Sequence, residues 1–314
     1  MNRRVQKTTT GTFFITLPKD WVKEYDIKHG ATLEIEIRRD GALIIYPPHG
    51  GYESRLDKVT VLYSKGQLST LKDFILGAYL LGYSMIDVIA KEGAIDPKDR
   101  EEIRRMVHSF IGLEVLDEDE RRMSIRSILD PLYTDPIKLL NRMAYLVEDM
   151  LRDGFKAILN GDLKLANIVA QRDDEVDRVY FLLIRLLRGA LRNPSLADKY
   201  MLSLVDYLDY RVAAKIIETI GDIASSLQPY IDRPIHDEDV KEVFDKMIDI
   251  YRFSIEVFFT KETKKRLQLM KMIRELSAKL ETTKKRKRNL YDLIRWLITE
   301  SIDIADLAIT IPPK

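Results

Sequence analysis

Two pairs of acidic residues in the second half of the chain have a spacing that could serve a metal ion. Asp173 and Asp177 are four residues apart, and so are Glu218 and Asp222. On an α-helix this spacing places both carboxylates of a pair on one face, where their oxygen atoms can converge on a cation. A lone pair of this kind is common on any solvated helix. The pattern becomes informative only if both pairs belong to one bundle.

The composition excludes several other kinds of chemistry. The chain has no cysteine, which removes disulfides and thiolate catalysis, and its four histidines are scattered, so the sequence shows neither a histidine-rich metal motif nor a catalytic triad. Lys and Arg number 51 against 50 Asp and Glu, so any basic surface must be local. No apolar stretch approaches the length of a membrane span. We therefore expect a cytoplasmic protein without stable membrane insertion.

Residues 135–309 are predicted to be helical throughout, within a domain at 133–314. Apolar residues recur at helical spacing in 137–160, and breaks at Gly161 and Asn193 separate this helix from the next two, the second of which is predicted to span 196–227. Three more helices are expected, one beginning near Asp237 and two covering about 262–283 and 289–308.

An internal repeat links the two halves of this helical part. The stretch DYLDYRVAAKIIETIGDIA at 206–224 aligns with LYDLIRWLITESIDIADLA at 290–308 at a constant offset. The aligned pairs include Tyr207 with Tyr291, Arg211 with Arg295 and Asp222 with Asp306. Each repeat would comprise three helices, so two stacked three-helix bundles are predicted, at 133–229 and 235–314.

The sequence IETIGDIA, together with the preceding RDDEVDRVY, resembles the PhoU family of phosphate-uptake regulators, which are built from two such bundles. In that family an acidic residue, three intervening residues and an aspartate provide carboxylates that bind metal clusters. The resemblance implies that Asp173, Asp177, Glu218 and Asp222 bind a divalent or trivalent metal. Iron or zinc is typical of the family, and magnesium is the alternative.

The second repeat departs from this pattern. Ile302 stands at the position of Glu218, although Asp306 is retained, and Glu275 is followed four residues later by Lys279. We therefore expect one good metal site, in the first bundle, and a degenerate or absent one at Glu275 and Asp306.

A helical wheel of 196–227 predicts where the second acidic pair points. Glu218 and Asp222 fall on the side opposite the apolar stripe, together with Tyr207 and Arg211, so the pair is expected on the outer surface. Arg211 could hold a phosphate or a carboxylate in a bidentate contact, or pair with Glu218, and Tyr207 would lie beside it. The apolar stripe itself would contain Val205, Val212, Ile216, Ile220, Ile223 and Leu227.

Residues 1–50 are predicted to form a small β-rich domain. A strand is expected at 13–17, then a short helix led by Pro18, a strand at 33–37 with alternating apolar residues, and a return strand at 42–46 after an Asp-Gly turn. So few strands are marginal alone, and an obligate partner chain is expected.

This order of elements resembles the AbrB/SpoVT/MazE family of swapped-hairpin domains, through the segments TLPKDWV, IKHGATLEIEI and DGALII and the basic start of the chain. The resemblance implies that two chains interleave their strands into one barrel, a homodimer that grips double-stranded DNA. The alternative is that the basic residues form a solubilising terminus and ordinary surface. The expected DNA contacts, doubled by the dimer symmetry, are Arg3, Arg4, Lys7, Thr8 and Lys19.

Residues 51–132 are predicted to form a small β-α-α-β-β module, which makes the whole chain a multidomain α+β protein. The expected elements are a strand at 59–63, a long apolar helix at 71–90, a second helix opened by Asp96 and Pro97, and strands at 112–116 and 123–128. The module carries no chemical signature. Its predicted roles are packing, spacing or small-ligand sensing.

Together these features favour a transcriptional regulator of phosphate uptake, with a DNA-binding head and a metal-binding sensor body. The rival hypothesis is a cytoplasmic adaptor that binds phosphate-transporter subunits or a sensor kinase and uses its N-terminal domain only to dimerise. An enzyme is not expected, because a metal hydrolase or oxidase would need an open coordination position and a general base. The basic run at 284–288 is predicted to be a solvated loop, with contact to a transporter near acidic lipids as the alternative.

Overall fold

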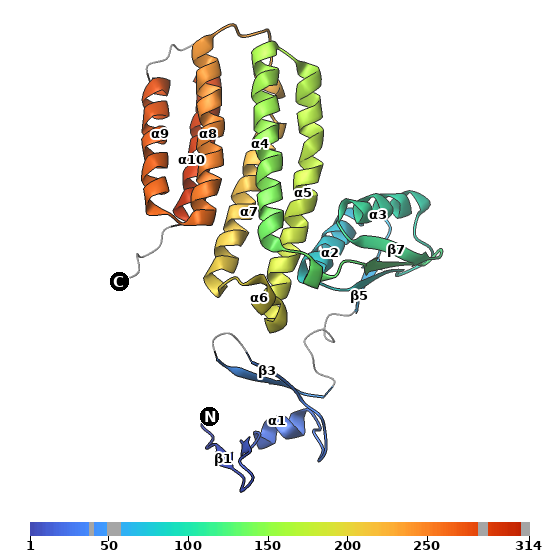
Figure 1. Ribbon diagram of the computed structural model, residues 1–314. Coiled ribbons are helices and arrows are strands. Elements are labelled where there is room, and N and C mark those ends of the chain that lie inside the picture. The colour runs from blue at the N-terminus through green and yellow to red at the C-terminus, as the bar shows by residue number, and fades with distance from the viewer. Residues whose placement is uncertain (38–40, 49–57, 282–287, 309–314) are drawn as a thin grey trace. The chain divides into compact units, whose positions relative to one another are not determined.

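The computed structural model is a multidomain α+β protein, and it describes residues 1–37, 41–48, 58–281 and 288–308 (Figure 1). The chain divides into two compact units, Met1–Asp57 and Lys58–Lys314, which are called unit 1 and unit 2 below. Asp40 of the predicted turn and the basic residues 284–287 lie outside the described residues.

Unit 1 contains two separate antiparallel hairpins and one short helix. The strand expected at 13–17 is confined to two residues, because the strand that pairs with it is itself only two residues long. The hairpin pairs are β1 with β2 and β3 with β4, so the described part of unit 1 contains no closed barrel. The elements are β1 (Gln6–Lys7), β2 (Phe13–Phe14), α1 (Lys19–Glu24), β3 (Glu34–Ile37) and β4 (Leu43–Tyr46).

No described side chain of unit 1 is buried in the single chain. Ile35 and Ile37 lie on one face of β3, as the alternation predicts, yet they are 60% and 75% exposed. Phe13 of β2 and Leu43 of β4 are also exposed. Isolated two-stranded hairpins are marginally stable in water because they lack a core. Unit 1 therefore needs another surface to cover its apolar residues.

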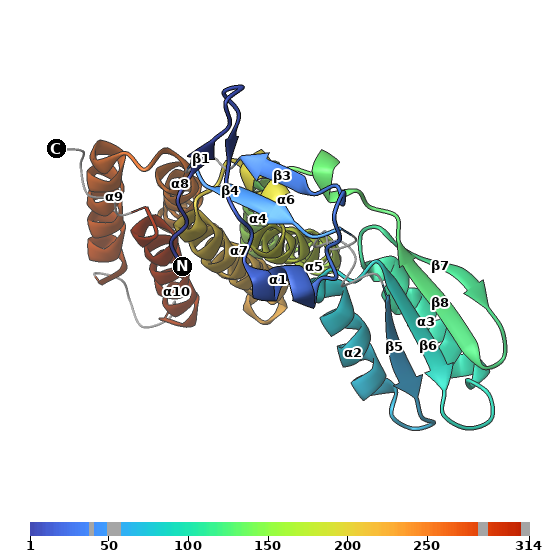
Figure 2. The ribbon, with the colours of Figure 1, turned by 90° about the horizontal axis from the view of Figure 1, so that it is seen from below.

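Unit 2 begins with a two-layer α/β module. Its sheet has the strand order β5-β6-β8-β7, in which β5 and β6 are parallel and the other pairs are antiparallel (Figure 2). Helices α2 and α3 cover one face of the sheet, because buried residues of both helices share one core with alternate strand residues. The elements are β5 (Lys58–Tyr63), α2 (Leu68–Leu81), β6 (Met85–Ala90), α3 (Pro97–Ser109), β7 (Leu113–Glu118) and β8 (Arg122–Ser127).

The helix predicted at 71–90 is confirmed as far as Leu81 but wrong beyond it, and the module is β-α-β-α-β-β. α2 ends at Leu81, because Gly82 takes a left-handed conformation with φ of 91°, and the apolar run MIDVIA forms the central strand β6. Ile86 and Val88 are buried under the helices, while Asp87 is buried on the other face by Lys58 and Arg122. The face of β6 away from the helices also carries apolar residues, the partly buried Met85 and Ile89, so the strand shows no polar–apolar alternation and periodicity alone could not separate it from a buried helix.

The rest of unit 2 is a helical bundle with two groups of three long helices. α4, α5 and α7 pack together, and so do α8, α9 and α10, in agreement with the internal repeat (Figure 1). None of the helices in the described part of the chain is long and apolar enough to cross a membrane. The helices are α4 (Pro136–Asn160), α5 (Leu163–Arg192), α6 (Pro194–Tyr200), α7 (Leu204–Ser225), α8 (Glu238–Thr260), α9 (Thr263–Glu281) and α10 (Arg288–Asp306), with single 3-10 turns at Pro131–Tyr133 and Gln228–Tyr230.

The single helix predicted at 196–227 is wrong, because the chain breaks between α6 and α7. Met201 has a φ of 58°, and α7 starts afresh with Ser203 as its N-cap. The Ser203 hydroxyl accepts a hydrogen bond from the Asp206 backbone N–H, and the Asp206 carboxylate accepts one from the Ser203 backbone N–H. This reciprocal capping satisfies N–H groups that the start of a helix leaves free, and it fixes where α7 begins.

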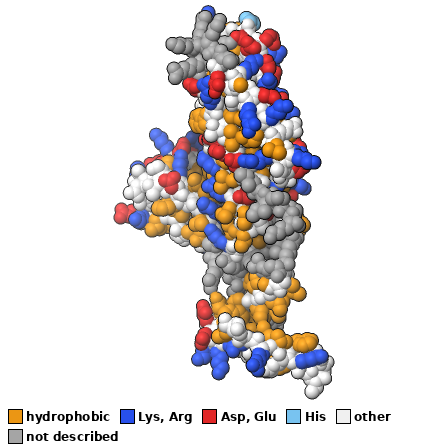
Figure 3. Space-filling view, turned by 90° about the vertical axis from the view of Figure 1, so that its left-hand side faces the viewer, with side chains coloured by type: hydrophobic (Ala, Val, Ile, Leu, Met, Phe, Trp, Pro, Cys, Tyr) orange, Lys and Arg blue, Asp and Glu red, His pale blue; other side chains and the backbone are white. Residues whose placement is uncertain are grey.

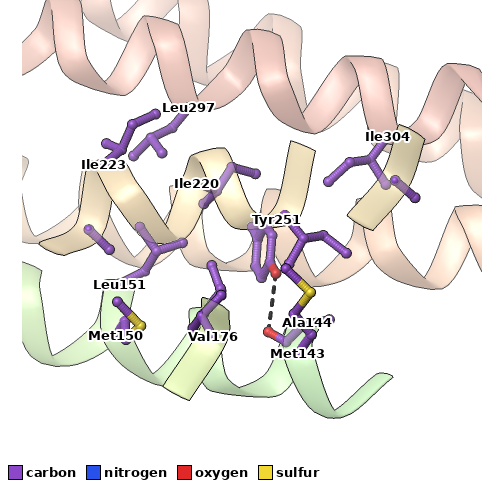
Figure 4. Close-up of a cluster of buried hydrophobic side chains, with 14 of the residues drawn as sticks. Met143, Ala144, Met150, Leu151, Val176, Ile220, Ile223, Tyr251, Leu297 and Ile304 are labelled. Atoms are coloured by element: carbon purple, nitrogen blue, oxygen red, sulfur yellow. Dashed lines mark hydrogen bonds between the residues drawn. The ribbon is translucent and has the colours of Figure 1, made fainter. Parts of the chain in front are cut away.

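The two helix groups share one hydrophobic core. Ile220 and Ile223 of α7 belong to the same buried cluster as Leu297 of α10 (Figure 4). Tyr251 of α8 also crosses between the groups, because its hydroxyl donates a buried hydrogen bond of 3.1 Å to the backbone carbonyl of Ala144 in α4 (Figure 4). The groups therefore form one packed body.

The α/β module is joined to this body through α2 and α5. Arg185 of α5 is buried and donates hydrogen bonds of 2.5 and 3.0 Å to the backbone carbonyls of Tyr79 and Tyr83 at the end of α2. Phe181 of α5 packs edge-on against Phe110, with ring centroids 5.8 Å apart. The helix that carries the first acidic pair thus also anchors the module.

Candidate functional site

The structure brings the four predicted acidic residues together from two neighbouring helices. Asp173 and Asp177 lie on α5, while Glu218 and Asp222 lie on α7. The two helices approach closely at Gly221, where an added Cβ would lie 3.9 Å from Oδ1 of Asp173. A larger residue at 221 would push α7 away from the carboxylates, so this glycine belongs to the site although the sequence pattern did not single it out.

The carboxylates share a common electrostatic environment. Burial, together with the charges of Asp173, Glu218 and Asp222, raises the pKa of Asp177 to about 6. Burial also raises the pKa of Asp173 and of Asp222, with the neighbouring carboxylates adding to it. Like charges held close together in a half-buried position destabilise their ionised forms. A cation among them would relieve both effects.

One carboxylate oxygen of this cluster is buried without a hydrogen-bond donor. Oδ1 of Asp173 is buried and accepts no hydrogen bond. A buried acceptor without a donor costs free energy unless a water molecule or a cation satisfies it. Within the described residues, however, no three His, Cys, Asp or Glu side chains are close enough together to hold a metal ion as they stand. The cluster therefore fits a cation in charge and donor type, but its side chains would have to turn to converge on one.

A lysine already lies beside the cluster. Lys215 of α7 pairs with Glu218, whose side chain is only 13% exposed. Burial alone would lower the pKa of Lys215, but the contact with Glu218 outweighs it and the net shift is upward. Lys215 thus provides part of the positive charge that a metal ion would supply. The sequence analysis missed it, although its spacing of three residues from Glu218 is a signal for such a pair.

The helical wheel of α7 is corrected by the structure. Tyr207 is buried at 1% exposure rather than lying on the outer surface, and Val205 and Val212 are exposed. The helix turns its small residues, such as Ala213 and Gly221, toward its neighbours, because they allow the closest packing. Hydropathy alone favoured the larger valines and so rotated the predicted face.

The members of the second acidic pair and Arg211 lie at different depths. Asp222 is exposed, while Glu218 is largely covered. Arg211 is only partly exposed, and its guanidinium lies over the ring of Tyr180 at 5.5 Å. A contact between Arg211 and a bound anion remains a prediction.

The second repeat offers a different environment at the equivalent positions. Asp306 accepts a hydrogen bond of 2.6 Å from Arg266, and Glu275 lies 4.0 Å from Lys271. The connections before α5 and α9 correspond, since Gly161 and Lys261 both cap the preceding helix in the left-handed conformation. That correspondence places Ile273 at the position of Asp173, and the repeat places Ile302 at the position of Glu218. Both isoleucines pack into the core.

The predicted DNA contacts all lie on the surface of unit 1. Arg3 and Arg4 precede β1, and Lys19 is the first residue of α1. Lys7 of β1 places its Nζ 5.2 Å from the centre of the Phe13 ring, and the Thr8 hydroxyl accepts a hydrogen bond from the Thr12 backbone N–H. In Figure 3, several Lys and Arg side chains lie along the lower edge of unit 1, below most of its hydrophobic side chains.

Comparison with protein families supports both resemblances. Residues 140–228 match the family model described as the PhoU domain, and residues 6–52 match the model described as antidote-toxin recognition MazE, bacterial antitoxin. The chain thus combines a segment similar to the PhoU domain with an N-terminal segment similar to the MazE domain. The PhoU match covers α4 to α7, and it includes all four acidic residues of the cluster. Comparison with curated proteins and with solved structures found no match.

Proposed function

We propose that this protein is a dimeric DNA-binding regulator of phosphate homeostasis whose PhoU domain senses a metal ion. The proposal is carried by two features together: a MazE-like unit with exposed basic residues, in which no described side chain is buried, and a PhoU-like domain with carboxylates that raise one another's pKa. The first feature supports a partner chain and an anionic ligand. The second supports a response to a cation.

Dimerisation through unit 1 follows from its exposed apolar residues. Two hairpins without a core gain one when the strands of a second copy cover residues such as Ile35 and Leu43. Interleaving would also give the β3–β4 hairpin further strand partners. The same symmetry would double every basic side chain on the surface of unit 1.

DNA binding would then rest mainly on charge. Arg3, Arg4 and Lys7 are exposed near the start of the chain and would contact phosphates, while Lys19 would add a contact from the start of α1. The helices α4 to α10 of unit 2 are called the PhoU body below. The PhoU body would act on DNA binding by changing how the two copies of unit 1 are arranged.

The metal would be held by Asp173 and Asp177 together with Glu218 and Asp222, which supply oxygen ligands only. Such a set favours oxygen-preferring cations, such as magnesium or ferric iron, over zinc, which most protein sites bind through Cys and His. When bound, the metal would supply positive charge between α5 and α7. Lys215 would then give up its contact with Glu218 or share that carboxylate.

The DNA-binding part is tested by gel shifts on promoter DNA of phosphate-transport genes. The wild-type chain should bind with an affinity that falls steeply as salt rises, since phosphate contacts release counterions. Arg3→Ala combined with Arg4→Ala should abolish binding, whereas Lys28→Ala, which removes an exposed lysine paired with Asp26, should change it little. Absence of salt-dependent binding together with retention of transporter subunits would favour the adaptor instead.

The metal part is tested by elemental analysis and by thermal unfolding with added magnesium, iron or zinc. Asp177→Asn should lower the metal content and remove the metal-dependent rise in Tm. Asp306→Asn, at the equivalent of Asp222 in the second repeat, is the matched control and should leave both unchanged. Equal metal content in the two variants would remove this site assignment.

A further inference from the structure

We infer that the exposed apolar face of α7 is a second contact between two copies of this chain. The face consists of Leu204, Val205, Leu208 and Val212, and it is called the α7 face below. Leu208 is 63% exposed, and the other three are between 45% and 66% exposed. This inference rests on the dimer of the proposed function, but it concerns the PhoU body and not the DNA-binding unit.

The α7 face is a continuous stripe on one side of the helix. At 100° per residue, its four members lie within about 60° of the direction in which Leu208 points. The residues that face the bundle, such as Tyr210 and Ile217, are buried and lie on the opposite side of α7. A soluble helix normally presents polar side chains on the side away from its core. The side chains of the α7 face therefore do not belong to the core of their own bundle.

The internal repeat provides a control for this face within the same chain. The constant offset places Leu204, Val205 and Leu208 opposite Arg288, Asn289 and Asp292 of α10. Tyr207 and Tyr291 are both buried, so the two helices present the same face to the core. At three of the four equivalent positions α10 has a charged or polar residue, while the fourth, opposite Val212, is the exposed Trp296. Asn289 and Asp292 are exposed without being apolar, so exposure at their positions does not itself demand apolar residues, and the α7 face points to a partner.

Charge at the two edges of the face indicates that the partner is another copy. Relative to Leu208, Asp209 lies about 100° to one side and Arg211 about 60° to the other. A two-fold axis parallel to α7 would set Asp209 of one copy opposite Arg211 of the second copy, and the reverse pair on the other edge. The face is thus self-complementary, as an interface between identical copies requires.

The size of the face fits a contact that adds to another. Its four side chains together expose less than the roughly 800 Å² that each partner buries in a standard stable interface. A pair of α7 faces would therefore not hold two free monomers together on its own. It would bring two PhoU bodies into a defined arrangement once unit 1 had joined the chains, because the effective concentration of tethered partners is high.

The chain contains no cysteine, so a single introduced thiol reports one position. Leu208→Cys in the full chain should form a disulfide between two copies under mild oxidation, at a rate at least about tenfold above that of Asp292→Cys, the equivalent exposed position on α10. Non-reducing gels at low protein concentration would follow the reaction. Adding Leu204→Ser to Leu208→Cys should slow the linkage, because it weakens the apolar contact without altering the thiol.

Light scattering on the same samples distinguishes a failure of the proposed dimer from a failure of the α7 contact alone. A monomeric wild-type chain would overturn both the proposed dimer and the α7 contact. A dimer in which Leu208→Cys links no faster than Asp292→Cys would overturn only the α7 contact, and the face would then be covered by another part of the same chain or by a different protein.

Discussion

The guanidinium of Arg185 lies over the ring of Tyr79, with its central carbon 4.8 Å from the ring centroid, and also donates a hydrogen bond to the backbone carbonyl of the same residue. A second hydrogen bond reaches the carbonyl of Tyr83. These carbonyls lie at the C-terminal end of α2, where the helix dipole favours a positive charge. Burial lowers the pKa of Arg185, yet an arginine remains charged at neutral pH. The α/β module and the helical bundle are therefore fixed to each other by a buried cation.

Removing this cation should loosen the junction. Arg185→Ala is expected to lower the free energy of unfolding by about 3 kcal/mol, because it leaves buried carbonyls without donors and opens a cavity. Arg185→Lys should rescue only part of the loss, since a lysine cannot reproduce the planar fork. Arg192→Ala is the matched control, because Arg192 donates to the carbonyl of Leu81 from a more exposed position. Urea unfolding measures all three, and equal losses for Arg185→Ala and Arg192→Ala would contradict the assignment.

The carboxylate cluster should make the metal-free protein less stable as pH rises. The pKa of Asp177 is 3.8 for a free side chain and about 6 in the fold, so the folded state holds its proton more tightly between these values. Stability is lost across that window. With a chelator present, Asp177→Asn should stabilise the protein by about 1 kcal/mol near neutral pH, after allowance for solvent screening, and by almost nothing below pH 4. Denaturant midpoints at both pH values provide the measurement, and a gain independent of pH would speak against the electrostatic cause.

Asp206 should show the opposite dependence. Burial alone would raise the pKa of Asp206, but hydrogen bonds from Lys261 and Ser203 outweigh it and hold the pKa below 3.8. The stabilisation is present above pH 3.8 and disappears as the pH falls through the lowered value. Asp206→Asn should cost about 2 kcal/mol near pH 7, because it breaks both the capping of α7 and the ion pair of 2.6 Å with Lys261. Thermal unfolding near pH 7 and near pH 3 provides the measurement. A cost of the substitution that is the same at both pH values would rule out this explanation.

The turn between α4 and α5 should not tolerate a side chain. Gly161 has a φ of 65°, and an added Cβ would lie 3.1 Å from the backbone nitrogen of Pro234. Gly161→Ala is therefore expected to lower the free energy of unfolding by about 1–2 kcal/mol. Gly77→Ala in α2 is the control, since a Cβ there meets no atom within 4 Å and helix propensity should give a small gain. Thermal unfolding of the two variants should shift in opposite directions.

Helix starts could be predicted from the sequence because their signals are local. Asp96 before Pro97 caps α3 and Asp135 before Pro136 caps α4, each through a side-chain bond to the following turn. The central strand β6 could not be predicted, because both of its faces carry apolar residues and the run therefore lacks the alternation that marks a strand.

The candidate site was predictable in part. The spacing identified Asp173 and Asp177, but the close approach of Asp173 to Gly221 depends on how α5 and α7 pack. The pair of Lys215 with Glu218 lies within α7, and its spacing is a local signal that was overlooked. The depth of Tyr207 also depends on packing, since small residues decided which side of α7 faced inward. Packing between helices is a property of pairs of surfaces, and a single helix does not reveal it.

Ile273 and Ile302 stand where the first repeat has Asp173 and Glu218, and this makes the two halves of the body chemically unequal. At these two positions the second half has hydrocarbon side chains, which take up neither protons nor metal ions. Any response to pH or to a cation at this level of the repeat would therefore arise in the first half alone.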